Sequence, residues 1–148
     1  MKFAVEVSLR WSDMDAYGHV NHARTVTLLE EARTELFFNE MPRRGMGRVD
    51  GGIVVSKLSV EYLSPLVYEG APVRVEAWVS EVRAASFVLR YAVRGRIDPR
   101  VMATAKTTMV PYDLVRGRPR RLTAAEREFL ALWTDDALAA SGTGSARV

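Results

Sequence analysis

The chain has 148 residues, of which 48% are hydrophobic, and this is the size and composition of a single globular domain. It carries 21 basic and 18 acidic residues, and this mild net charge of +3 comes without the broad basic face, interleaved with aromatic residues, that nucleic-acid binding requires. The absence of cysteine excludes disulfides, thiolate zinc sites, iron–sulfur clusters and a cysteine nucleophile, and two histidines are too few for an all-histidine metal site within one chain. We therefore expect no metal, no other cofactor and no nucleic-acid partner.

Residues 2–11 alternate between apolar and polar side chains, which predicts a half-buried β-strand. Because this segment carries Glu6 and Arg10, it does not read as a signal peptide, and no stretch is apolar enough to span a membrane. We expect a cytoplasmic protein. Residues 12–21 then break the alternation and predict a loop.

From residue 21 or 22 the apolar spacing changes to three and four, which predicts an amphipathic helix of about four turns with Asn21 as its N-cap. Residues 41–52, with Pro42 and four glycines, are expected to form a connection that could act as a lid. Glu30 or Glu31 could turn from this helix toward the sheet and would then need a partner; the alternative is a solvated helix face or a structural ion pair.

Four further strands are expected at residues 53–66, 73–80, 87–94 and 100–110, the last ended by Pro111. Their short connections favour an antiparallel meander. Thr123 and Glu126 form the capping-box pattern of a short C-terminal helix that runs to about Leu138. The expected fold class is α+β: a curved antiparallel sheet of about five strands around one long helix, in one domain over 1–138, with a flexible tail at 139–148.

The loop before the long helix holds most of the candidate functional residues. They are Asp13, Asp15, Tyr17, His19, Asn21 and His22. The free N–H groups and partial positive charge of a helix N-terminus can polarise a carbonyl, and a nearby carboxylate can act as nucleophile or general base. The pattern therefore favours acyl hydrolysis, although aspartate, asparagine and Gly18 are also what a capped helix and a turn require.

Several motifs resemble the hotdog-fold acyl-CoA thioesterases of the 4-hydroxybenzoyl-CoA thioesterase type. The signature residues are Asp13, Asp15, Gly18, Val20 and the run Glu30-Glu31-Ala32-Arg33. Downstream, residues 60–65 (VEYLSP) are similar to the family's V-x-Y-x-x-P strand end, and residues 117–120 (GRPR) are similar to the segment before its C-terminal helix.

This resemblance implies a hotdog fold in which two subunits pair edge to edge, with active sites at their interface, so we expect a homodimer or homotetramer. It implies that Asp15 is the catalytic carboxylate and that the backbone N–H of His22 polarises the thioester carbonyl. The run from His19 to Asn21 is closer to acyl-ACP thioesterases, in which an aspartate, an asparagine and a histidine share the site; His19 and Asn21 are therefore further catalytic candidates. Tyr17 stands where that branch has its first asparagine.

The remaining candidates concern the substrate. Tyr17, Gly18 and Tyr62 are expected to contact it, and Arg118 and Arg120 are expected to hold the phosphates of CoA. A solvated loop is the alternative for these arginines, and Arg43, Arg44 and Arg48 are alternative phosphate ligands. The sequence leaves open an acyl-CoA thioesterase, an acyl-ACP thioesterase, a hotdog dehydratase and a non-catalytic acyl-CoA-binding protein.

Overall fold

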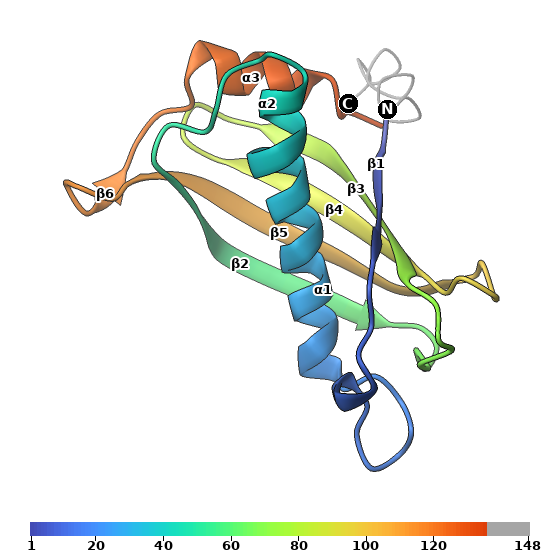
Figure 1. Ribbon diagram of the computed structural model, residues 1–148. Helices are drawn as coiled ribbons and strands as arrows, with labels where there is room; N and C mark the ends of the chain where they lie inside the picture. Colours follow the sequence, from blue (N-terminus) through green and yellow to red (C-terminus); the bar gives the residue numbers. More distant parts are fainter. Residues whose placement is uncertain (136–148) are drawn as a thin grey trace, which may run out of the picture.

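The computed structural model describes residues 1–135, in which one antiparallel sheet curves around a long helix (Figure 1). The strands are β1 (Phe3–Val7), β2 (Gly52–Tyr62), β3 (Val73–Val82), β4 (Phe87–Arg94), β5 (Val101–Asp113) and the two-residue β6 (Arg118–Pro119). Their order is β1-β3-β4-β5-β2, with β6 paired to β5. This confirms the α+β hotdog fold. The expected domain end at 138 and tail at 139–148 lie outside the described residues.

The long helix extends further than its apolar pattern indicates. It consists of α1 (His22–Thr34), a π-helical segment η2 (Glu35–Glu40) and a short α2 (Met41–Arg43), 22 residues in all. The prediction that a connection begins at residue 41 is therefore wrong. The N–H of Met41 donates to the carbonyl of Leu36, five residues earlier, so the turn before Pro42 is wider than an α-turn. That extra width gives room to a proline ring that would otherwise meet the preceding turn.

β5 also continues past a proline that was expected to end it. The carbonyl of Pro111 accepts a hydrogen bond of 3.0 Å from the N–H of Arg120, while Pro111 itself pairs with Ile53 of β2. On the side to which the N and the carbonyl of Pro111 point, β4 no longer pairs with β5 beyond Met109, and β6 pairs there instead. The missing N–H costs at most one hydrogen bond in this short ladder, while the carbonyl of Pro111 keeps its donor and the pairing with β2 is unaffected, so β5 runs to Asp113.

Three other boundaries are shorter than expected. β1 stops at Val7 because its partner strand β3 begins at the opposite residue, Val73; a 3₁₀ turn (Trp11–Asp13) follows. β2 stops at Tyr62 because the next two N–H groups both donate to the carbonyl of Met102. The capping box at Thr123 is confirmed, but α3 (Ala124–Ala131) ends well before residue 138.

The core lies between the long helix and the concave face of the sheet. Leu29 and Phe37 of the helix are almost completely buried, and each contributes roughly 1.5–3 kcal/mol of hydrophobic stabilisation. Phe37 contacts Phe87 of β4 and Phe129 of α3, with ring centroids 5.5 and 6.2 Å apart. Both glutamates of the acidic pair, Glu30-Glu31, are exposed, so the idea that one turns inward is wrong and the solvated-face alternative is confirmed.

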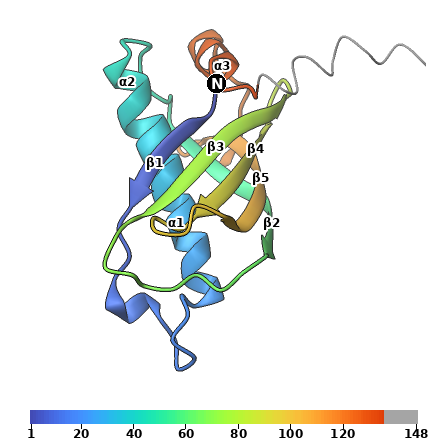
Figure 2. The ribbon, with the colours of Figure 1, turned by 90° about the vertical axis from the view of Figure 1, so that its right-hand side faces the viewer.

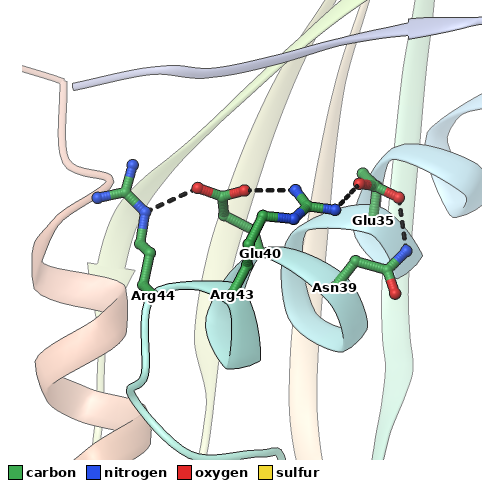
Figure 3. A network of polar contacts seen from close by, with 5 residues as sticks. All are labelled: Glu35, Asn39, Glu40, Arg43 and Arg44. Atoms are coloured by element: carbon green, nitrogen blue, oxygen red, sulfur yellow. Dashed lines mark hydrogen bonds and ion pairs between the residues drawn. The ribbon is translucent and has the colours of Figure 1, made fainter.

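Ion pairs fix the C-terminal end of the long helix (Figure 3). Glu40 accepts from Arg43 and Arg44 at 2.8 Å each, and Glu35 accepts from Asn39 at 2.6 Å and from Arg43 at 3.1 Å. The hydrogen bonds from Asn39 and Arg43 hold the pKa of Glu35 below its usual value. This end of the helix is thus a closed polar network.

The two edges of the sheet are β1 and β2, on opposite sides (Figure 2). β2 is the more exposed edge. Its large apolar side chains Val55, Leu58 and Tyr62 are 41%, 43% and 50% exposed. An apolar edge strand with unpaired backbone groups can pair with another strand.

Candidate active site

The loop before α1 is a small closed hairpin. Met14 and Val20 form an antiparallel bridge, the N–H of Asp15 donates to the carbonyl of His19 at 2.9 Å, and the N–H of Gly18 donates to the carbonyl of Asp15 at 3.0 Å. Gly18 has φ of 75°, a conformation that favours glycine. The hairpin therefore fixes the backbone of Asp15 directly before the helix.

The two aspartates of the loop have different surroundings. Asp13 is buried, and its carboxylate accepts hydrogen bonds from the backbone N–H and the guanidinium of Arg10, at 2.8 and 3.0 Å. Burial alone raises the pKa of Asp13, but the hydrogen bonds and charge of Arg10 outweigh it and hold that pKa below its usual value. Asp13 thus anchors the loop.

Asp15 uses only one of its carboxylate oxygens within the protein. Oδ1 accepts from the N–H of Tyr17 at 2.9 Å, which orients the carboxylate. Among the described residues, no group donates a hydrogen bond to Oδ2. The side chain of Asp15 borders a pocket of about 430 Å³, large enough for part of a small-molecule ligand.

This pocket brings together most of the site residues expected from the sequence. The loop and helix contribute Asp15, Tyr17, His19, His22 and Thr25. The sheet contributes Tyr62, Met102 and Ala103, and the segment after β2 contributes Ser64. Tyr17 is 86% exposed at the rim, and His19 is exposed beside it.

The start of α1 forms one wall of the pocket. The side chain of Asn21 accepts from the N–H of Ala23 at 2.9 Å, which confirms Asn21 as the N-cap. The N–H of His22, in the first turn, has no acceptor within the described part of the chain, so a donor at the positive end of the helix is left free.

Tyr62 connects the end of β2 to this first turn. Its hydroxyl donates to the carbonyl of His22 at 2.6 Å, and the two rings meet edge to face with centroids 6.4 Å apart. Burial raises the pKa of the Tyr62 hydroxyl, so this group stays protonated and remains a donor.

The arginines expected to bind CoA do not line this pocket. Arg118 is exposed on β6, at the opposite end of the long helix from the loop (Figure 1). Arg120 forms a bidentate ion pair with buried Glu126, in which its two terminal nitrogens donate to the two carboxylate oxygens at 2.7 and 2.8 Å. Arg43 and Arg44 are held by carboxylates of the long helix. Their proposed contact with CoA stays a prediction.

Sequence reasoning missed Thr25, Met102 and Ala103. Thr25 follows His22 by three positions and so lies on the same helix face, a signal that was available. Ala103 reaches the pocket because it pairs with Tyr62, and that register is not visible in the sequence. Over residues 1–135, no group of three or more histidine, aspartate or glutamate side chains could hold a metal ion. No helix within the same range is long and apolar enough to cross a membrane.

The family model described as the thioesterase-like superfamily matches residues 9–133. The chain belongs to this superfamily. It is therefore a thioester hydrolase, as its loop and helix pattern predicts. The match covers the loop, the long helix and every strand from β2 to β6.

Individual relatives agree with this assignment. The long-chain acyl-CoA thioesterase FadM of Escherichia coli is 26% identical over 125 residues, which cover 84% of this chain and 94% of the relative. A thioesterase from Thermus thermophilus, whose crystal structure holds coenzyme A and zinc, is 27% identical with a TM-score of 0.69, over 87% of this chain and 92% of that one. A 1,4-dihydroxy-2-naphthoyl-CoA thioesterase from Synechocystis has a TM-score of 0.72 over 88% of this chain and 96% of its own; at 16% identity it shows the shared fold alone.

Proposed function

We propose that this thioester hydrolase cleaves acyl-CoA, with Asp15 as its catalytic carboxylate and the N–H of His22 as the group that polarises the thioester carbonyl. The observation that carries the proposal is that one pocket borders both an aspartate with an unused oxygen and a helix that begins with an unused N–H donor. The similarity to FadM and to a thioesterase that binds coenzyme A supports CoA as the carrier.

A thioester suits so simple a site because its carbonyl lacks amide resonance. A hydrogen bond from the His22 N–H, together with the helix dipole, stabilises the oxyanion that forms when the carbonyl carbon is attacked. In one route, Asp15 takes a proton from water, the hydroxide attacks, and the tetrahedral intermediate expels the CoA thiolate, which is then protonated. In the other, Asp15 attacks directly, the thiolate leaves, and water hydrolyses the resulting anhydride.

The neighbouring residues act around these two groups. Tyr62 holds the carbonyl of His22 and so positions the first turn of the helix. Asn21 caps that turn, and this is how we expect it to affect catalysis. His19 at the rim is placed to orient water, and Tyr17 shapes the entrance. Gly18 does not line the pocket; it provides the turn between these two residues.

We also propose that the protein forms a homodimer through β2, either alone or within a tetramer. Two copies of β2 paired antiparallel about a two-fold axis would cover the exposed apolar edge. The Gly52 end of one β2 would then lie beside the Tyr62 end of the other. Since Gly52 pairs with Tyr112, and Tyr112 with Pro119 of β6, this arrangement carries Arg118 of the partner subunit toward the pocket. In that position the arginine can bind a CoA phosphate, while Arg120 fixes β6 through Glu126.

The test is release of free thiol from acetyl-, hexanoyl-, palmitoyl-, benzoyl- and phenylacetyl-CoA. Wild type is compared with Asp15→Asn and with Glu30→Gln, an exposed helix carboxylate outside the pocket. We expect Asp15→Asn to lose at least about 1,000-fold in kcat/KM, or about 4 kcal/mol of transition-state stabilisation, and Glu30→Gln to match wild type.

Two outcomes would replace the proposal. Hydrolysis of acyl-ACP without hydrolysis of any CoA ester would change the carrier. Binding of acyl-CoA by wild type and Asp15→Asn alike, with no turnover by either, would indicate a non-catalytic binding protein.

A further inference from the structure

Basic side chains gather on the convex face of the sheet, away from the long helix. Leu89 and Tyr91 of β4 are buried against the helix, so Arg90 between them points to the opposite face. Arg90 stands directly opposite Lys106 of β5, and Lys106 stands opposite Ser59 of β2. Like charges in directly opposed positions destabilise a sheet, so this pair needs a compensating interaction.

Lys57 adds a third positive charge to this row. It lies on the same face of β2 two positions before Ser59 and is therefore a diagonal neighbour of Lys106. The chain has three lysines, and two of them stand here. Within the described residues, neither Lys57, Lys106 nor Arg90 forms an ion pair.

The other half of the same face is neutralised. Near β1, Glu76 pairs with Arg94 at 2.7 Å and with Arg74 at 3.7 Å. Glu81, also on β3, is held by Arg83 at 2.7 Å. On β2, Glu61 lies on the far side of Lys106 from Lys57. The β2 half of the convex face therefore keeps an excess of positive charge.

This excess surrounds a depression of about 600 Å³. Its polar lining consists of Lys57, Lys106, Ser59, Ser86, Thr108 and the ion-paired Arg83 and Glu81, so the unpaired charges in it are the two lysines. Buried Val88, whose backbone pairs with Thr108, lies at its floor. Ammonium and hydroxyl donors that converge on a concave surface form the donor set for a phosphate group.

We propose that this convex-face depression is a binding site for a phosphate-bearing small molecule, held chiefly by Lys57 and Lys106. It lies on the opposite face of the sheet from the pocket of Asp15, so it does not depend on the proposed catalytic residues. Pairing of β2 with another strand uses the backbone edge and leaves Lys57 and Ser59 on the open face.

The direct test is calorimetric titration of the full chain with pyrophosphate. The double variant Lys57→Gln/Lys106→Gln is compared with Arg96→Gln/Arg121→Gln, which removes the same charge at exposed positions outside the depression. We expect saturable binding to wild type, at least tenfold weaker binding to the lysine variant, and less than a twofold change in the control. Equal weakening in both variants, or no saturation by wild type, would overturn the proposal.

Two further measurements separate the sources of the phosphate. If bound pyrophosphate raises the KM for acyl-CoA in wild type but not in the lysine variant, the site takes a phosphate of CoA itself; an unchanged KM indicates a separate ligand. A short DNA duplex is also tested as a competitor. If it displaces pyrophosphate and has the higher affinity of the two, the ligand is a nucleic acid and the proposal is overturned.

Lys106→Gln alone should also raise the thermal midpoint of the ligand-free protein, since it removes the repulsion between Lys106 and Arg90.

Discussion

The two ends of the long helix differ in how completely their polar groups are used. At the C-terminal end, Glu35 and Glu40 are shared among Asn39, Arg43 and Arg44 (Figure 3). At the N-terminal end, the N–H of His22 and one oxygen of Asp15 lack partners among the described residues. A satisfied network adds rigidity and binds nothing further, whereas unused donors and acceptors beside a pocket are available to a substrate.

The sharpest way to break this contrast is to remove the free donor without removing the helix. His22→Pro deletes the backbone N–H at the first helical position, where proline is well tolerated, and Asn21 already has the extended backbone (φ −58°, ψ 138°) that a residue before proline prefers. We expect kcat to fall by roughly 100- to 1,000-fold, as for loss of one oxyanion-hole donor.

The control for that experiment is His22→Ala, which keeps the N–H and removes the imidazole. It should stay within about tenfold of wild type, and circular dichroism should show equal helix content in both variants. Equal losses in the two variants would assign the effect to the side chain and exclude the backbone donor.

Near the far end, the largest expected effect is on stability. Glu126→Gln leaves the mostly buried guanidinium of Arg120 without its counter-charge, so the free energy of unfolding should fall by about 3 kcal/mol. Urea unfolding measures the change, and Glu128→Gln, at an exposed position of the same helix, should be near neutral. Unchanged stability in Glu126→Gln would show that the pair stabilises nothing.

The same pair predicts a pH dependence. Burial raises the pKa of Glu126, but its hydrogen bonds from Arg120 and Thr123 outweigh this and hold the pKa below the usual 4.5. A depressed pKa stabilises the folded state above the unfolded value, and this stabilisation is lost as pH falls toward the folded value. The difference in unfolding free energy between wild type and Glu126→Gln should therefore be constant from pH 7 to about 5 and shrink below 4.5.

The smallest effect is expected at the exposed part of the network. Arg44 pairs with Glu40 and lies over the ring of Trp133, 4.8 Å from its centroid. Exposed ion pairs and cation–π contacts contribute little, so Arg44→Gln should cost less than about 1 kcal/mol and leave kcat unchanged. A change in kcat would mean that the two ends of the helix are coupled.

The parts of the fold that sequence could predict are those fixed by local chemistry. The alternating pattern was sufficient to predict β3 and β4, and the capping residues Asn21 and Thr123 were sufficient to predict where two helices begin. Each of these signals depends on residues a few positions apart. Pro42 and Pro111 led to wrong element boundaries because the free-energy cost of a missing N–H depends on its surroundings. Pro42 follows a π-turn, and Pro111 lies beyond the point where β4 stops pairing with β5.

The candidate site was predictable to the same extent. The loop and helix residues of the pocket are adjacent in sequence, so Asp15, His19 and His22 could be found there. Ala103 could not, because it arrives through the register of β5 with β2. The different surroundings of Asp13 and Asp15 could not be predicted from the sequence either, since they depend on which carboxylate forms hydrogen bonds with Arg10.

The hydrogen bond from Tyr62 to His22 has a consequence for the assembled protein. Tyr62 is the last residue of the edge strand, so the side chain that positions the first turn of the helix is carried by the strand we expect a second copy to cover. Assembly and catalysis would then be thermodynamically linked. Specific activity per chain should fall as the protein is diluted below the dissociation constant of the dimer, and substrate should in turn tighten the association of the two copies.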